Sequence, residues 1–261
     1  MSKAKQPGKS SGTLRLGQLG LLVLLLGVCE ALVRSGTVSS LYLPAPVQVM
    51  KELGRLFADG GLFKAIGVTL GEFLAGYGLA AAGGMAVGLF LVLVPWAEAF
   101  FRPYLSALMA IPKVTIIPLL ALWLGIGMTH KISIVFLFCF FTIAINTMTG
   151  VKQTADQHLK VARVFEASRA QTIVKVILPS AAPTIFAGLR LSAATGLVGA
   201  LFGEMLGSKD GLGNILVKAT SLYNTPQAFG IVVLVTLVSV LLIGLIDWLE
   251  RKVFLKWKST Y

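Results

Sequence analysis

The chain has 261 residues, of which 56% are hydrophobic and 13% charged, and its mean hydropathy is +0.84. This composition excludes a soluble globular domain. Three runs without Asp, Glu, Lys or Arg, at 73–97, 132–151 and 219–246, reach the roughly 20 residues that a helix needs to cross a bilayer. A net charge of +12 is also found in nucleic-acid-binding proteins, but in so apolar a chain it is more typical of anchoring in a membrane. We therefore expect contact with lipid and no nucleic-acid partner.

The first quarter of the chain predicts a tail, a first membrane helix and a segment along the membrane surface. Residues 1–15 are basic and polar, as in a disordered cytoplasmic tail, and residues 16–34 are apolar enough for a membrane helix. A cleaved signal peptide is the alternative for this short run, but 28–33 offers no convincing small-residue cleavage site. In 35–64 the apolar residues fall on one helical face, which predicts an interfacial helix. That face consists of Val47, Met50, Leu53, Leu56 and Phe57.

Residues 65–247 predict a membrane core of five further spans, followed by a basic tail at 248–261. We expect the spans at about 68–94, 104–124, 132–150, 184–206 and 229–246, with a short turn at 95–103. The first of these spans is rich in glycine, which allows close contact between helices. We favour packing over a gating hinge as the reason for these glycines.

Two spans contain residues that suggest a transport path. Pro112 and Pro118 remove backbone hydrogen bonds, which a membrane protein tolerates where protein or a water-filled path supplies partners. Lys113 lies beside this break, so it either faces a path or extends its ammonium to the nearer interface. Arg190 in the span 184–206 is open to a similar pair of interpretations, since it could reach the interface or face the axis of a dimer.

The polar segment 152–183 is too regularly patterned for a simple connector. Its apolar residues follow helical spacing, and its charges recur every third position. Those charges are Lys160, Arg163, Glu166 and Arg169. The pattern predicts two short amphipathic helices outside the bilayer, with the helical pattern broken at 178–179. It also allows Glu166 to pair with Arg163 or Arg169.

The distribution of Lys and Arg predicts the orientation. With six spans, the segments on the side of both termini and of 152–183 carry twice as many Lys and Arg as the segments on the opposite side. The positive-inside rule therefore places both termini and 152–183 in the cytoplasm.

Several motifs, each weak alone and specific as a set, resemble the permease subunits of ABC importers. The resemblance is closest to the type I subgroup that serves sulfonates, taurine, nitrate and related small anions. The motifs lie at 43–46, 111–118, 125–131, 162–183, 188–191 and 203–205. Within 162–183 the dipeptide Ala162-Arg163, then A-S-R, L-P and A-P resemble the EAA loop of these permeases. Two positions depart from that loop, because Lys160 replaces its usual Glu and Glu166 its usual Gly.

The resemblance implies an all-α, polytopic fold with six transmembrane helices in a bacterial inner membrane, and alternating access without a cofactor. It also implies that the EAA loop docks on a separate cytoplasmic ATPase, present in two copies. The ATPase-coupling residues would be Lys160, Ala162, Arg163, Glu166, Ala167, Ser168 and Arg169. The translocation path would include Met109, Pro112, Lys113, Pro118, Arg190 and Glu204. A second permease copy completes the path, with a paralogue as the alternative, and a periplasmic or lipid-anchored binding protein delivers the solute.

No catalytic constellation is recognisable, so we expect a transport subunit and ATP hydrolysis on another chain. His130 and His158 are predicted on opposite sides of the membrane, and Cys29 and Cys139 lie in separate apolar runs, so neither a metal site nor a disulfide is predicted. An ATP-independent channel or secondary transporter is the competing hypothesis. Secondary transporters often place ionisable residues at mid-membrane, whereas the central runs here nearly lack them.

Overall fold

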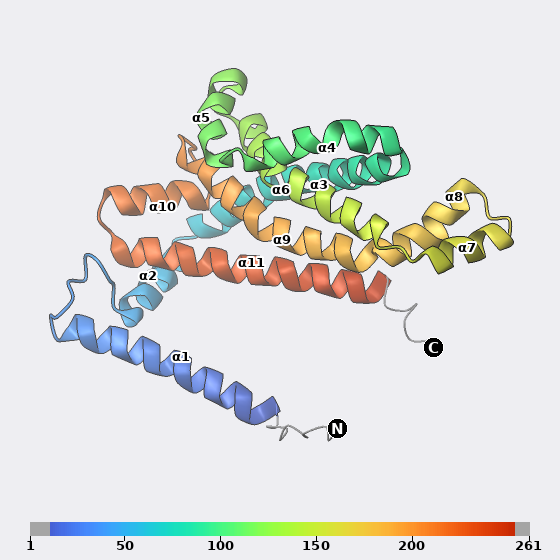
Figure 1. The fold of residues 1–261 in the computed structure, drawn as a ribbon. Coiled ribbons are helices and arrows are strands. Elements are labelled where there is room, and N and C mark those ends of the chain that lie inside the picture. Colours follow the sequence, from blue (N-terminus) through green and yellow to red (C-terminus); the bar gives the residue numbers. More distant parts are fainter. Residues whose placement is uncertain (1–10, 254–261) are drawn as a thin grey trace.

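The computed structural model describes residues 11–253, and the regular structure within this range is helical throughout (Figure 1). The helices are α1 (Ser11–Arg34), α2 (Pro46–Ala58), α3 (Gly61–Leu93), α4 (Pro95–Ala110), α5 (Lys113–Leu124), α6 (Met128–Lys152), α7 (Asp156–Val164), α8 (Arg169–Thr172), the π-helical η1 (Ile173–Ile177), α9 (Leu178–Met205), α10 (Leu212–Ser221) and α11 (Thr225–Val253). The predicted all-α membrane fold is confirmed. Most of both predicted tails, including Lys256 and Lys258, lies outside the described residues. Residues 11–15 already belong to α1 rather than to a tail.

Within the described residues, five helical segments are long and apolar enough to cross a membrane. They are Leu16–Arg34, Gly61–Leu93, Met128–Lys152, Arg169–Met205 and Thr225–Lys252. The pair α4 and α5 passes the same test only together, and it is bent by 93°. The span expected at about 104–124 is thus formed by two helices with a break at 111–112, and the bent pair taken as one broken span would be the sixth crossing. Ile111 is extended, with ψ 127°, because the ring of the following proline disfavours the helical conformation there.

The predicted turn at 95–103 is also helical. Pro95 occupies the first turn of α4, where a missing backbone N–H breaks no helical hydrogen bond, and Pro103 lies inside the helix. The chain bends instead at Ile111 and Pro112, between α4 and α5.

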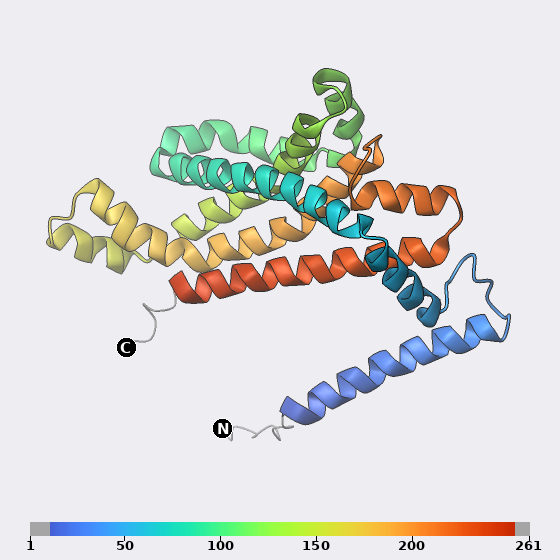
Figure 2. The ribbon, with the colours of Figure 1, turned by 180° about the vertical axis from the view of Figure 1, so that it is seen from behind.

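The core of the bundle is formed by α3, α6 and α9, with α11 packed along α9 (Figures 1 and 2). A stripe of small residues at four-residue spacing on α3 faces α6. Its members are Gly76, Ala80, Gly84 and Gly88. A Cβ atom on Gly76 would lie 2.6 Å from the carbonyl oxygen of Ile132, and one on Gly88 would lie 2.5 Å from that of Ala144. The backbones thus approach too closely for any larger residue.

The helix α1 lies apart from the bundle, and none of the residues in its apolar window is buried (Figure 2). The amphipathic helix α2 follows it, as predicted, but its buried residues are Val49, Leu53 and Leu56. Val47, Met50 and Phe57, which were expected on the same face, are exposed. Since Val49 and Leu53 pack with Ile231 and Leu234, α2 is anchored on α11.

The predicted break at 178–179 is wrong, because the helical path runs from Arg169 to Met205 without interruption. The π-helical turn η1 precedes Pro179, which lies in the first turn of α9. Such a wide turn provides a local adjustment where the proline supplies no N–H. Of the two amphipathic helices predicted in 152–183, α7 is therefore separate, and the second consists of α8 and η1, which continue into α9.

Candidate functional site

The helix α7 presents an unburied apolar face at one end of the molecule (Figure 1). Val161 is 54% exposed, and Val164 and Phe165 are each 80% exposed. Ala162, on the other side, is buried. Because apolar side chains of this size are usually covered when no partner binds, this face is a candidate docking surface.

The C-terminus of α7 is a Schellman turn with Glu166 at its left-handed position. The amide of Ala167 donates to the carbonyl of Ala162 at 2.9 Å, and the amide of Glu166 donates to the carbonyl of Arg163 at 3.0 Å. Glu166 has φ 50°, which glycine adopts more readily than any other residue. A glycine at this position would adopt the turn without strain.

The expected pairing of Glu166 with Arg163 or Arg169 is absent from the ion pairs of the described residues. The reason is that α7 ends at Val164, so Glu166 has left the helical geometry that spacing of three residues requires.

The next helix begins with a complete capping box. The hydroxyl oxygen of Ser168 accepts from the amide of Gln171, and the Gln171 side chain accepts from the amide of Ser168. This motif satisfies two backbone N–H groups at the start of α8. The seven predicted coupling residues are therefore brought together at one end of the molecule, all exposed except Ala162, which is buried, and Ala167, which is half-buried.

The predicted path residues are divided among three places. Met109, Pro112 and Pro118 are exposed on the bent pair α4 and α5. Lys113 is half-buried, and its Nζ donates to the carbonyl of Phe138 at 3.0 Å and lies 5.8 Å from the centre of that ring. These four residues share the bend, whereas Arg190 and Glu204 do not.

Arg190 bridges two helices near the end of α11. Its guanidinium pairs with Asp247 at 3.0 Å and also with Glu250. A cation held by two carboxylates of its own chain ties α9 to α11.

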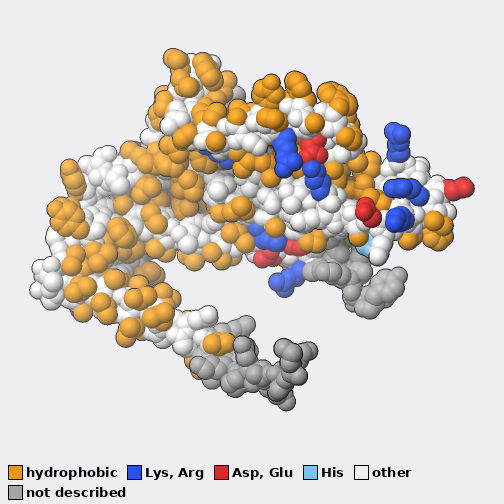
Figure 3. Space-filling view, viewed as in Figure 1, with side chains coloured by type: hydrophobic (Ala, Val, Ile, Leu, Met, Phe, Trp, Pro, Cys, Tyr) orange, Lys and Arg blue, Asp and Glu red, His pale blue; other side chains and the backbone are white. Residues whose placement is uncertain are grey.

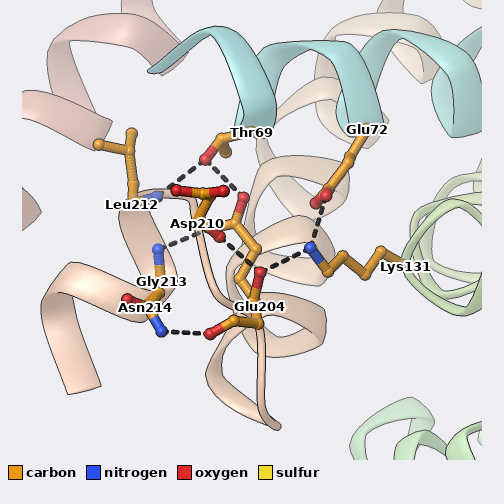
Figure 4. A network of polar contacts seen from close by, with 9 residues as sticks. Thr69, Glu72, Lys131, Glu204, Asp210, Leu212, Gly213 and Asn214 are labelled. Atoms are coloured by element: carbon orange, nitrogen blue, oxygen red, sulfur yellow. Dashed lines mark hydrogen bonds and ion pairs between the residues drawn. The ribbon is translucent and has the colours of Figure 1, made fainter. Parts of the chain in front are cut away.

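Glu204 lies about 20 Å further along α9, given the helical rise per residue, and is fully buried (Figure 4). Its Oε1 accepts from the hydroxyl of Thr69 at 2.6 Å, and its Oε2 accepts from the amide of Gly213 at 2.6 Å. The Thr69 oxygen in turn accepts from the amide of Leu212 at 3.0 Å. Two side chains from neighbouring helices thus cap the N-terminus of α10, so Glu204 serves packing inside the protomer.

An adjacent ion pair completes this polar network (Figure 4). Lys131 Nζ donates to Glu72 at 2.6 Å and to the hydroxyl of Ser208 at 2.7 Å. Both members of the ion pair are buried, and the hydroxyl of Ser208 donates to the carbonyl of Asp210. The network joins α3, α6, α9 and the loop before α10 into one unit.

Sequence reasoning missed Thr69 and Glu72. A signal was present for Glu72, because it is the only acidic residue in the 33 residues of α3, and an ionisable residue within a membrane helix marks a structural or functional partner. For Thr69 no local signal exists, since its partner Glu204 is 135 positions away. Within 11–253 no group of three His, Cys, Asp or Glu side chains could hold a metal ion.

Comparison with known proteins places this fold in a family. Residues 65–255 match the family described as binding-protein-dependent transport system inner membrane component. The putative aliphatic sulfonates transport permease protein SsuC of Bacillus subtilis is 31% identical, over the whole chain and 95% of its own length. The riboflavin transport system permease protein RibX of Chloroflexus aurantiacus is 31% identical, over 94% of the chain and 91% of its own length. The taurine transport system permease protein TauC of Escherichia coli is 30% identical, over 86% and 83%.

Among solved structures, the inward-facing MetNI methionine ABC transporter matches with a TM-score of 0.63 at 20% identity. The match covers 76% of this chain and 96% of that chain, and it supports the fold. Together with the family match over 65–255, it confirms the resemblance found in the sequence. The chain belongs to the family of binding-protein-dependent transport system inner membrane components, and it is a permease subunit of the type I ABC importers rather than an enzyme.

Proposed function

We propose that this permease imports a small anionic solute of the sulfonate class. SsuC and TauC, named for sulfonates and taurine, support this class, but RibX, named for riboflavin, is equally similar to the chain. The names of these relatives therefore do not identify the solute that this permease imports. The single observation that favours an anion is the unbalanced positive charge at the bend between α4 and α5.

That charge belongs to Lys113 in the first turn of α5. Its recorded contacts are with the carbonyl and ring of Phe138, and no carboxylate within the described range forms an ion pair with it. The N-terminus of α5 also lacks a capping side chain, and free N–H groups there favour negative charge. Met109, Pro112 and Pro118 are exposed on the same bent pair of helices as Lys113, and these four residues form the proposed path lining.

We further propose that α7 docks on a separate ATPase, because its exposed apolar face has no partner within 11–253. An amphipathic helix of this kind commonly binds in a groove of another protein. The ATPase would act through the coupling residues on α7 and α8 and drive alternating access.

The excess of Lys and Arg on the side of α7 supports a cytoplasmic location for this end and for both termini, in a bacterial inner membrane. The opposite side, which carries α2 and α10, would then receive solute from a periplasmic or lipid-anchored binding protein. Six crossings enclose only part of a path, and two-fold symmetry is the commonest arrangement of identical subunits. We therefore propose that two copies of the permease form a homodimer, which binds two copies of the ATPase.

The test is uptake of radiolabelled taurine by proteoliposomes that contain the permease, its cognate ATPase and its binding protein. Lys113→Met should lower the initial rate at least tenfold, while Lys113→Arg, which keeps the charge, should retain most of it. The mass of the purified complex and its basal ATP hydrolysis should be unchanged in both variants. Normal taurine uptake by Lys113→Met would refute the role of this charge. If the wild-type complex imports riboflavin and no sulfonate, the solute class is wrong.

A further inference from the structure

We infer that the surface formed by α7 and α8 selects an ATPase whose docking groove is apolar at its centre and acidic at its rim. This inference rests on the proposed docking of α7, and it adds the chemistry of the partner. The apolar centre corresponds to the exposed side chains of Val161, Val164 and Phe165.

The acidic rim follows from a cluster of cations around this apolar face, as seen at the end of the molecule that carries α7 and α8 in Figure 3. All four cations are exposed, and none is paired within residues 11–253. They are Lys160, Arg163, Arg169 and Lys175. Several exposed cations elsewhere, by contrast, have an acidic neighbour in their own chain. Examples are Arg34 with Glu30, Arg55 with Glu52, Lys64 with Asp210 and Arg102 with Glu98.

The two acidic residues of the same segment do not neutralise these cations. Asp156 lies in the first turn of α7, where the partial positive charge of the helix N-terminus interacts with it. Glu166 is held in the left-handed turn and forms no ion pair with its neighbours. A net positive charge therefore remains beside the apolar face.

Lys160 is the cation that gives the surface its specificity. It precedes Val164 by four residues and so lies on the same side of α7, one turn away. An acidic residue of the partner would pair with Lys160 at this contact, whereas an ATPase suited to a different permease could carry a basic residue there. Against Lys160 such a residue would repel, and like-charge contacts at interfaces suppress wrong partners.

A groove beside α7 offers room for a side chain of the partner. It measures about 610 Å³ and lies between α7 and the start of α9. Ala162, Phe165 and Val176 contribute apolar surface to it, and Lys175 contributes a cation. The groove thus repeats the same combination of an apolar centre and a positive edge.

Anionic lipid headgroups are the other ligand that could attract these cations. The arrangement of the helices favours a soluble partner, because α7 and α8 project beyond the end of α11 instead of lying along the bundle (Figures 1 and 2). A surface that extends past the ends of the membrane helices is placed to meet a protein.

The experiment measures the affinity of the full-length permease in detergent for its purified cognate ATPase, at about 0.05 M and about 0.5 M NaCl. The higher salt should weaken wild-type binding at least tenfold. Lys160→Glu with Lys175→Glu should weaken binding at least tenfold at low salt, whereas Lys51→Glu, a reversal on α2 at the far end, should change it less than twofold. Phe165→Asp should abolish binding at both salt concentrations.

These variants separate the two claims. If Phe165→Asp binds the ATPase normally, docking through α7 is wrong. If Phe165→Asp abolishes binding but salt and the charge reversals have no effect, docking stands and the acidic rim is wrong. If the reversals leave ATPase affinity unchanged and weaken binding of the permease to phosphatidylglycerol vesicles, the cations serve lipid and the inference is overturned. Equal elution volumes and melting temperatures of all variants exclude misfolding.

Discussion

The close packing of α3 on α6 predicts that Gly88→Ala destabilises the fold although it adds only one methyl group. The new Cβ would lie 2.5 Å from the carbonyl oxygen of Ala144 and 2.8 Å from Cβ of Thr147. Both atoms belong to or adjoin the backbone, so neither can rotate away, and the helices must separate by about 1 Å. Overpacking of this kind costs about 1–3 kcal/mol. We expect the upper half of that range.

Gly78→Ala is the matched control on the same helix, because nothing lies within 4 Å of its added Cβ. Alanine favours helix over glycine by up to about 1 kcal/mol, so this variant should be neutral or slightly more stable. The assay is unfolding of both purified variants by titration with SDS, followed by circular dichroism. Equal stability of Gly88→Ala and Gly78→Ala would refute the packing argument. A Gly88→Ala protein that is fully stable but inactive in transport would instead favour a hinge.

Two other substitutions test the turn after α7 and the buried ion pair. Glu166→Gly should relieve the strain of the left-handed backbone by about 1 kcal/mol and slow hydrogen exchange of the Ala167 amide several-fold. Glu166→Ala should bring no such gain. Equal exchange rates in the two variants would contradict the strain. Lys131→Met should cost about 3–5 kcal/mol in SDS unfolding, because it leaves the buried Glu72 carboxylate unpaired, and the double variant with Glu72→Gln should recover part of that loss. If Lys131→Met alone is as stable as the wild type, the ion pair of Lys131 and Glu72 is dispensable for stability.

The membrane helices could be predicted because their signal is long and redundant. Each of α3, α6, α9 and α11 holds many consecutive apolar residues, and an error at one position changes little. The bend at Ile111 and Pro112 was harder to predict, since a proline within a span is compatible with a kink, a broken helix or an undisturbed first turn. In this chain Pro112 lies at a break between helices, whereas Pro95 and Pro179 lie in the first turn of a helix, and the local sequence does not distinguish these outcomes.

The two candidate sites also differ in how well the sequence predicts them. The coupling residues are nearly consecutive, so any local structure brings them together. All of the expected path residues except Met109 are charged residues or prolines within spans, and their separation depends on partners distant in the sequence. Glu204 shows the difficulty: a buried carboxylate that caps a helix and one that lines a path look alike until Thr69 and Gly213 are placed beside it.

The distribution of charge along the molecule connects the buried network to the exposed surface. Beside the start of α10 the ion pair of Lys131 and Glu72 is buried, and Glu204 caps α10, so that these groups fix α3, α6, α9 and α10 relative to one another. Around α7 the charges are exposed and unmatched, which suits a surface that binds another protein. The two ends are joined without a flexible connector, because α8, η1 and α9 form one helical path from Arg169 to Met205. If an ATPase docks on α7 as proposed, a displacement of the ATPase is therefore transmitted to α9. Glu204, at the far end of α9, passes this displacement on to α10.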